Sequence, residues 1–236
     1  CVRTADESVL CFGQTHGGGR AHSTAPVAMP ALAGAAQLAV GMTHSCAKMG
    51  DGTVRCWGSN FRGQLGDGTT VDHLEPMPVP GLSGVEQVAV GAFSTCARML
   101  DETVRCWGYN GLGALGLDPS QEVVATPTQV PSLANVAHVA MGEFHRCVRR
   151  TDGFVLCWGG RYWSQIGDGV GGGDAQALAP QPVLLRTLPP VEQLAVGQRH
   201  SCGLLPGGAL RCWGYNVGGG LGDGTREDRA TPVAVR

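Results

Sequence analysis

CAKMGDGTVRCWG, residues 46–58, places two cysteines ten positions apart around an Asp-Gly turn and puts Trp-Gly directly after the second cysteine. The same arrangement returns as CARMLDETVRCWG from residue 96, CVRRTDGFVLCWG from residue 147 and CGLLPGGALRCWG from residue 202. A diverged copy, CVRTADESVLCFG, begins at residue 1, so all ten cysteines fall into five equivalent pairs. The first cysteines stand at residues 1, 46, 96, 147 and 202, which gives a repeat of 45 to 55 residues.

The segments on both sides of this hairpin repeat as well. An apolar run such as QLAVGMTHSC (37–46) leads in, and a Gly-rich loop such as SNFRGQLGDGT (59–69) follows, with a Pro-containing segment such as EPMPVPGL (75–82) after it. Each repeat therefore predicts about four short strands separated by Gly, Asp, Asn and Pro turns. Four strands in about 50 residues are typical of a blade in an all-β propeller, whereas the repeats of a β-solenoid are usually shorter.

The recurring elements LAVGMTHSC, GDGTVRCWG and NFRGQLGDGT, with the Pro-rich closing strand, resemble the repeat of the regulator of chromosome condensation family. The resemblance covers residues 1–236 and implies a β-propeller, commonly of seven blades. Nuclear members of that family act on a small GTPase and on chromatin. Secreted proteins with this type of blade, among them a bacterial β-lactamase inhibitor, are similar in architecture, and their partners meet the turns through aromatic side chains.

The chain is expected to form one propeller domain, residues 1–236, from five cysteine hairpins. Counted from cysteine to cysteine, the repeats are 1–45, 46–95, 96–146, 147–201 and 202–236, the last being incomplete. Two arrangements stay open, a smaller or open ring of five blades and a part of a seven-bladed ring. Because the chain does not begin with Met, we expect a mature product or a fragment.

The geometry of the hairpin predicts five local disulfides. The midpoint of each pair falls in the turn, as Asp51 does between Cys46 and Cys56, so the two cysteines should lie opposite each other on an antiparallel ladder. The Cβ separation expected there is slightly wide for a disulfide but can close with a small adjustment. The predicted bonds are Cys1–Cys11, Cys46–Cys56, Cys96–Cys106, Cys147–Cys157 and Cys202–Cys212.

Full pairing of the cysteines indicates an oxidising compartment, and we expect an extracellular, cell-surface or periplasmic location. Free buried thiols are the first alternative. Zinc is the second, although its sites need closely spaced Cys pairs that converge on one point. Sixteen Arg beside a single Lys, Lys48, together with abundant Ala and Gly, are typical of GC-rich codon usage and favour a bacterial source.

The composition excludes several classes of partner. A net charge of −2 disfavours a nucleic-acid surface, which normally carries a concentrated basic patch. No apolar run approaches the roughly 20 residues of a membrane helix, so we expect no membrane insertion. Gly is abundant, at 38 residues, which suits an all-β repeat fold with many tight turns.

No motif for catalysis or for a cofactor stands out, and we predict a non-enzymatic protein without cofactor or metal. One position of the lead-in turn, the His slot, is occupied by His44, Ser94, His145 and His200 in successive repeats. We expect these side chains to fix neighbouring turns through hydrogen bonds, and we disfavour the alternative that the imidazoles bind a metal together. In the Gly-Asp-Gly loops, Asp67, Asp168 and Asp223 are expected to form turns, because the ligand spacing of a calcium loop is absent. An aromatic residue follows the second cysteine of every repeat, in what we call the aromatic slot, and we expect it to pack between the blades. These residues are Phe12, Trp57, Trp107, Trp158 and Trp213.

If the core is repetitive, function should lie where the repeats differ. The first variable region is the turn before the His slot, where the candidates are Met42, Phe93, Phe144 and Arg199. The second follows Trp-Gly and includes Phe61, Arg62 and Tyr109, with Arg161, Tyr162, Trp163 and Tyr215 as its leading candidates. The run RYWSQ departs most from the family, since we align Arg161 with Asn60 and Trp163 with Gly63. Aromatic and Arg side chains are the usual anchors of protein interfaces.

We therefore predict a secreted propeller that acts as a protein–protein binding module or scaffold, with another protein as its partner. A cell-surface or carbohydrate-binding adhesin is the first alternative, in which Trp163 and the tyrosines would stack on sugars. An enzyme with a site on the propeller axis and an intracellular exchange factor are the others.

Overall fold

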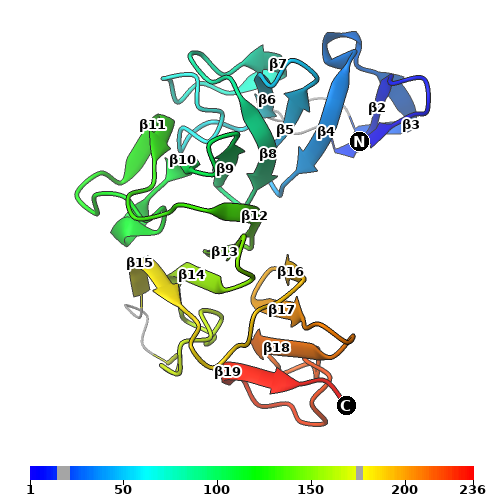
Figure 1. Cartoon of the computed structure of the whole chain (residues 1–236). Helices are drawn as coiled ribbons and strands as arrows, with labels where there is room; N and C mark the ends of the chain where they lie inside the picture. The colour runs from blue at the N-terminus through cyan, green and yellow to red at the C-terminus, as the bar shows by residue number, and fades with distance from the viewer. Residues whose placement is uncertain (15–21, 174–177) are drawn as a thin grey trace. The chain divides into compact units, whose positions relative to one another are not determined.

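The computed structural model describes residues 1–14, 22–173 and 178–236, and these residues form strands and two single-turn 3-10 helices. The strands belong to five separate antiparallel sheets, one for each cysteine hairpin in the described part of the chain (Figure 1). The all-β class and the one-sheet-per-repeat organisation predicted from the sequence are both confirmed.

Successive strands of the chain are neighbours in each sheet. The first sheet contains β1 (Val2–Arg3), β2 (Val9–Gln14) and β3 (His22–Ala28). The second contains β4 (Ala35–Val40), β5 (His44–Met49), β6 (Val54–Gly58) and β7 (His73–Pro78). The third contains β8 (Val85–Val90), β9 (Ser94–Met99), β10 (Val104–Tyr109) and β11 (Val123–Gln129). The fourth contains β12 (Val136–Met141), β13 (His145–Arg150), β14 (Val155–Gly160) and β15 (Leu178–Leu184). The fifth contains β16 (Gln193–Val196), β17 (His200–Leu204), β18 (Leu210–Gly214) and β19 (Arg229–Ala234).

A complete sheet is made of the lead-in strand, the two strands of the cysteine hairpin and the Pro-containing closing strand. The sheets are therefore shifted against the cysteine-to-cysteine repeats, since each begins at its lead-in strand. The fifth sheet, which the cysteine count leaves incomplete, has all four strands, while the first has three in the described residues. The 3-10 helices η1 (Pro30–Leu32) and η2 (Gly111–Gly113) lie in connections between strands.

The register of the hairpins places each pair of cysteines face to face. Cys46 is the ladder partner of Cys56, and the same holds for the pairs beginning at Cys96, Cys147 and Cys202. All five predicted disulfides are present, and no cysteine in the described residues is free. The Cα atoms of each pair are 4.0–4.1 Å apart, so the two strands of each hairpin approach closely at the cysteines.

The chain divides into two compact units. Unit 1 consists of Cys1–Tyr109 and Val123–Gln129 and holds the first three sheets. Unit 2 consists of Asn110–Glu122 and Val130–Arg236 and holds the last two sheets together with η2.

Within each unit, the Trp of one sheet packs on the Gly-rich loop of the sheet before it. Trp107 is fully buried, and its indole Nε1 donates to the Gln64 carbonyl at 2.9 Å. Gly66 lets the ring approach this loop, because a Cβ there would lie 2.6 Å from Trp107 Nε1. The expected role of the aromatic slot in packing is thus confirmed for the Trp residues, which are all buried.

Phe12 is the exception in this slot, because its ring is 50% exposed. The prediction that it packs like the Trp residues is wrong. Phe12 lies in the first sheet, and among the described residues no Gly-rich loop of a preceding sheet is present to cover it.

Candidate binding surface

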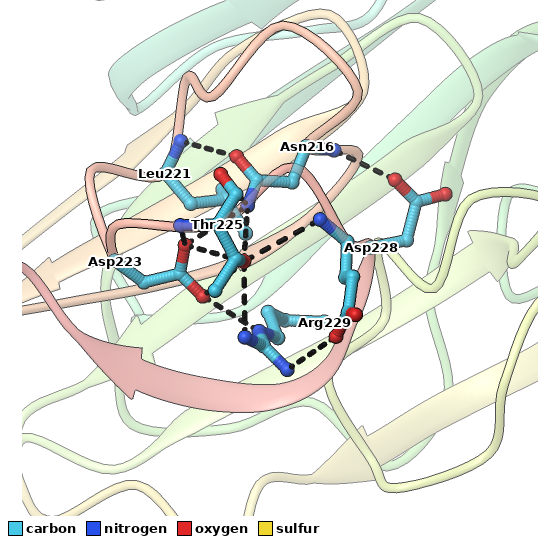
Figure 2. A network of polar contacts seen from close by, with 7 residues as sticks. Asn216, Leu221, Asp223, Thr225, Asp228 and Arg229 are labelled. Carbon is cyan, nitrogen blue, oxygen red and sulfur yellow. Dashed lines mark hydrogen bonds and ion pairs between the residues drawn. The ribbon is translucent and has the colours of Figure 1, made fainter.

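The Gly-rich loops after Trp-Gly are shaped by a buried Asn side chain. Asn216 Oδ1 accepts the Leu221 amide at 2.9 Å, and its Nδ2 donates to Asp223 Oδ1 at 3.1 Å (Figure 2). The backbone amide of Asn216 donates to Asp228 Oδ1 at 2.7 Å. Asn60 and Asn110 accept the equivalent Leu amide in their own loops. Because the Asn holds the loop from inside, the residues just after it are turned outward.

The acid of the Gly-Asp-Gly sequence closes the same loop. Asp223 Oδ1 accepts the Thr225 amide at 2.9 Å, and Asp223 Oδ2 accepts Arg229 Nε at 2.6 Å (Figure 2). Burial works against the charge on Asp223, but the hydrogen bonds from Arg229, Thr225 and Asn216 outweigh it and hold the pKa of this carboxyl well below its usual range. Asp67 bonds the amide of Thr69 in the same way, so the turn-forming role predicted for these acids is confirmed.

The loop of the fourth sheet, residues 161–172, departs from this pattern. Arg161 replaces the Asn, and its Nη2 forms an ion pair with Asp168 Oδ2 inside the loop. Ser164 adopts the positive φ of 61° that Gly63 has (70°) in the second sheet, and its Oγ accepts the Gly172 amide at 2.9 Å. Arg161 therefore forms an ion pair within its own loop, and its place on the predicted binding surface stays a prediction.

The position of Trp163 also corrects the alignment made from the sequence. The Trp163 amide donates to Gln165 Oε1 at 2.7 Å, and the Arg62 amide donates to Gln64 Oε1 at 2.8 Å. Trp163 therefore corresponds to Arg62, so the alignment with Gly63 is wrong by one residue.

Four other predicted candidates gather around Trp163 in unit 2. The ring centroids of Tyr162 and Tyr215 lie 5.7 and 6.5 Å from that of Trp163, both edge to face. The Phe144 ring lies 6.3 Å from Trp163 at a tilt of 33°. The Arg199 guanidinium carbon lies 4.1 Å from the Trp163 ring centroid, the geometry of a cation–π contact. We call Phe144, Tyr162, Trp163, Arg199 and Tyr215 the Trp163 cluster; all five side chains are half-buried.

Glu143 holds the cation of this cluster in place. Its Oε2 accepts Arg199 Nε at 3.1 Å. The Glu143 side chain is 13% exposed and that of Arg199 is 37% exposed, so the carboxylate lies deeper than the guanidinium. The sequence analysis missed this ion pair. The available signal was that Glu143 and Arg199 stand in neighbouring positions of successive lead-in turns.

A second group of aromatic residues lies in unit 1. Phe61 and Phe93 meet edge to face with centroids 5.7 Å apart. The Arg62 guanidinium carbon lies 5.6 Å from the Phe61 centroid and 4.8 Å from that of Tyr109. We call these four residues the Phe61 cluster. The structure thus joins the candidate Phe93 to three residues that were not among the leading candidates.

Met42 belongs to neither cluster by any ring contact. Its side chain is 50% exposed, and its turn is anchored by the adjacent Thr43, whose Oγ1 donates to the Ala92 carbonyl at 2.7 Å. Met42 is therefore presented on a turn beside that of Phe93 as a single exposed apolar side chain.

The His slot is structural, as predicted. His44 Nε2 lies 2.7 Å from Thr95 Oγ1, and His145 Nε2 lies 2.8 Å from Ser201 Oγ, so each buried ring bonds the next sheet of its unit. Burial, with the neighbouring charge of Arg146, lowers the pKa of His145 to about 3. Across the described ranges, no three His, Cys, Asp or Glu side chains come together as a metal-binding group. No helix in the same residues has the length and apolar character needed to cross a membrane.

Two family models, both described as the regulator of chromosome condensation (RCC1) repeat, match this chain. One matches residues 51–98 and 101–148, and the other matches residues 35–64, 85–114 and 191–219. The matched segments include the lead-in strands, cysteine hairpins and Gly-rich loops described above.

Proteins similar to this chain come from mouse, Arabidopsis thaliana and yeast. The chain is 40% identical over 200 residues to the probable E3 ubiquitin-protein ligase HERC4 of mouse, covering 83% of this chain and 18% of HERC4. It is 33% identical over 233 residues to the ultraviolet-B receptor UVR8 of Arabidopsis thaliana, covering 95% of this chain and 52% of UVR8. A crystal structure of yeast RCC1 (Prp20) bound to Kap60 contains a chain with 25% identity and a TM-score of 0.80, covering 91% of this chain and 52% of that one. The β-propeller fold is thereby confirmed, and the chain spans about half or less of each of these relatives.

Proposed function

Because the chain belongs to the regulator of chromosome condensation (RCC1) repeat family, we propose that it is a protein-binding module without catalytic activity, and that its partner docks on the Trp163 cluster. The observation that carries this proposal is the set of half-buried aromatic side chains around Trp163, with the Arg199 guanidinium stacked on the indole. Trp, Tyr and Arg are the residue types in which the binding energy of protein interfaces is concentrated.

The cluster is rigid before a partner arrives. The Trp163 backbone is fixed by Gln165, and the Arg199 side chain is held between Trp163 and Glu143. Ordering a free, rotamer-rich side chain at an interface costs about 0.5–1.5 kcal/mol, and much of that cost is already met here. A preorganised aromatic surface of this kind favours binding over a merely structural role for these residues.

Relatives support a binding role more than an enzymatic one. Prp20 has been crystallised in complex with another protein, Kap60. The ligase activity in the name of HERC4 belongs to a protein of which this chain matches only 18%. We therefore propose that the module described here binds a protein partner and performs no chemistry.

We further propose that the module works outside the cytosol, at the cell surface or in the periplasm. All ten cysteines are paired in five disulfides, and most of their sulfur atoms are buried in the sheets. Disulfide sets of this kind form and persist in oxidising compartments.

Carbohydrate binding is the second candidate, because Trp163 lies between Tyr162 and Tyr215 as in an aromatic platform for sugars. Arg199 already covers one face of the indole, however, which leaves less of the ring for a sugar to stack on. If wild type binds glycans on an array and Trp163→Ala does not, carbohydrate binding would be favoured over a protein partner.

The proposal is tested with the immobilised chain and the secreted and surface proteins of the source cells. Wild type, Trp163→Ala and Phe61→Ala are compared, because Phe61 is an exposed aromatic residue in unit 1. We expect a protein that wild type and Phe61→Ala retain and that Trp163→Ala loses, with a dissociation constant raised at least about 30-fold when the purified pair is measured. If Trp163→Ala binds every retained protein as tightly as wild type does, the proposal is wrong.

A further inference from the structure

We infer that the partner presents a carboxylate side chain next to an apolar residue, and that the terminal Nη1 and Nη2 groups of Arg199 bind this carboxylate. This inference rests on the proposed function and specifies the chemistry of the partner. It follows from how Arg199 is held in the Trp163 cluster.

Arg199 is restrained from two directions. Its guanidinium carbon lies over the Trp163 ring, 4.1 Å from the ring centroid, and its Nε donates to Glu143 Oε2 at 3.1 Å. No described residue accepts a hydrogen bond from Nη1 or Nη2 of Arg199. The guanidinium is therefore held by two contacts, and its outer edge, which carries two parallel N–H groups, has no acceptor among the described residues.

A planar guanidinium edge matches the two oxygens of a carboxylate, which it binds through two parallel hydrogen bonds. The stacked Trp163 and the Glu143 contact set the orientation in advance, so little side-chain freedom remains to be lost. Phe144, Tyr162 and Tyr215 pack around Trp163 and supply apolar surface for a residue beside the carboxylate. Hydrogen bonds between a guanidinium and a carboxylate are charge-assisted and stronger than those between neutral groups.

The arrangement of charges favours an anion over a cation. The Glu143 side chain is 13% exposed and that of Arg199 is 37% exposed, so the guanidinium is the more accessible charge of this ion pair. Arg161, in the loop that carries Trp163, is paired with Asp168, and its side chain is 15% exposed, less than that of Arg199. A Lys or Arg from a partner would have to displace Arg199 from Trp163 and would be repelled by it on approach.

The test uses a random dodecapeptide phage library panned on the intact chain. Peptides are kept only if they bind wild type and fail to bind Trp163→Ala, which ties them to the cluster. We expect an Asp or Glu beside an apolar residue in these peptides. A synthetic peptide from the set should bind about 10- to 100-fold more weakly when its acid is changed to the matching amide, which leaves the protein itself unaltered.

Arg199→Lys provides the matched change in the protein, because it keeps the charge and removes the planar edge. It should weaken binding of the acidic peptide about tenfold, whereas Arg186→Lys, at an exposed Arg after β15, should not change it. Two results would overturn the inference that Arg199 binds a carboxylate. The first is that the chain binds glycans and no peptide. The second is that Trp163-dependent peptides bind equally well after their acid is changed to the amide and after Arg199→Lys. In the second case the proposed protein-binding function survives; if no peptide depends on Trp163, both proposals fail.

Discussion

Arg62 and Trp163 occupy the same position in two equivalent loops, and each supplies one half of an Arg–aromatic contact in its own unit. Arg62 lies 4.8 Å from the ring centroid of Tyr109, while the Trp163 ring receives Arg199 at 4.1 Å. Tyr215, the counterpart of Tyr109, is kept beside Trp163 at 6.5 Å. Both units thus contain a guanidinium packed on an aromatic ring. In unit 1 the Gly-rich loop supplies the Arg, whereas in unit 2 the loop supplies the Trp and the lead-in turn supplies the Arg.

The Arg199–Trp163 contact should contribute measurably to stability. A double-mutant cycle of Arg199→Met and Trp163→Leu should give a coupling energy of about 0.5–2 kcal/mol, the range of cation–π pairs from exposed to desolvated sites. Urea unfolding of the two single variants, the double variant and wild type measures it. A matching cycle of Trp163→Leu with Arg186→Met serves as the control and should be additive. Equal coupling energies in the two cycles would mean that the Arg199–Trp163 contact does not contribute to stability.

The approach of Trp107 to the Gly-rich loop predicts a strong effect of Gly66→Ala. Gly66 has a φ of 76°, and an added Cβ would lie 2.6 Å from Trp107 Nε1. Gly34 has a φ of 79°, but a Cβ there would meet nothing within 4 Å. Gly34→Ala should therefore cost only the left-handed backbone penalty of about 1–2 kcal/mol.

Gly66→Ala should cost at least about 2 kcal/mol more than Gly34→Ala, because it also displaces Trp107 from its hydrogen bond with the Gln64 carbonyl. Unfolding in denaturant, followed by Trp fluorescence, compares the two variants. Equal losses of stability would mean that the packing of Trp107 on Gly66 contributes nothing of its own.

Burial of His145 predicts acid sensitivity. An unfolded His titrates near 6.5, whereas the folded pKa of His145 is about 3, so between these pH values only the unfolded chain takes up the proton. Its contribution to stability is complete above the unfolded pKa and declines as the pH falls. Between pH 7 and pH 5 the loss should be about 2 kcal/mol.

His145→Asn removes this titration, so its unfolding free energy should fall less over the same pH range by about that amount. Above pH 7.5 the two proteins should show a constant difference, which measures the cost of the substitution itself. Identical pH profiles would indicate that His145 takes up its proton equally in both states.

The disulfides should be reduced in a definite order under native conditions. Cys1 and Cys202 are half-buried, whereas both cysteines of the three central pairs are fully buried. Thiol–disulfide exchange needs access to a sulfur atom, so Cys1–Cys11 and Cys202–Cys212 should be reduced first. Brief reduction, alkylation and peptide mass spectrometry would map the order; earlier labelling of Cys96 or Cys106 would contradict it.

Much of the fold could be predicted because it follows from local spacing. Two cysteines placed symmetrically about Asp51 fix the hairpin register, and the recurring lead-in and Pro segments give the other two strands. The correspondence of Trp163 with Arg62 was available from the sequence, because the two loops align without a gap from Cys56 and Cys157; the hydrogen bond from the Trp163 amide to Gln165 confirms it. Sequence could not reveal that Arg161 would be held by Asp168 within its loop.

Contacts between different sheets were the least predictable. Glu143 and Arg199 are 56 residues apart, and only the packing of two lead-in turns brings them together.

The central claim is that this chain is a disulfide-bonded binding module of an oxidising compartment. The most direct test is the intact mass of the chain isolated from its source under denaturing conditions, alkylated with and without prior reduction. Without reduction we expect no added label, and after reduction ten labels, one for each cysteine. Ten labels without reduction would contradict this claim and would indicate that the chain resides in a reducing compartment.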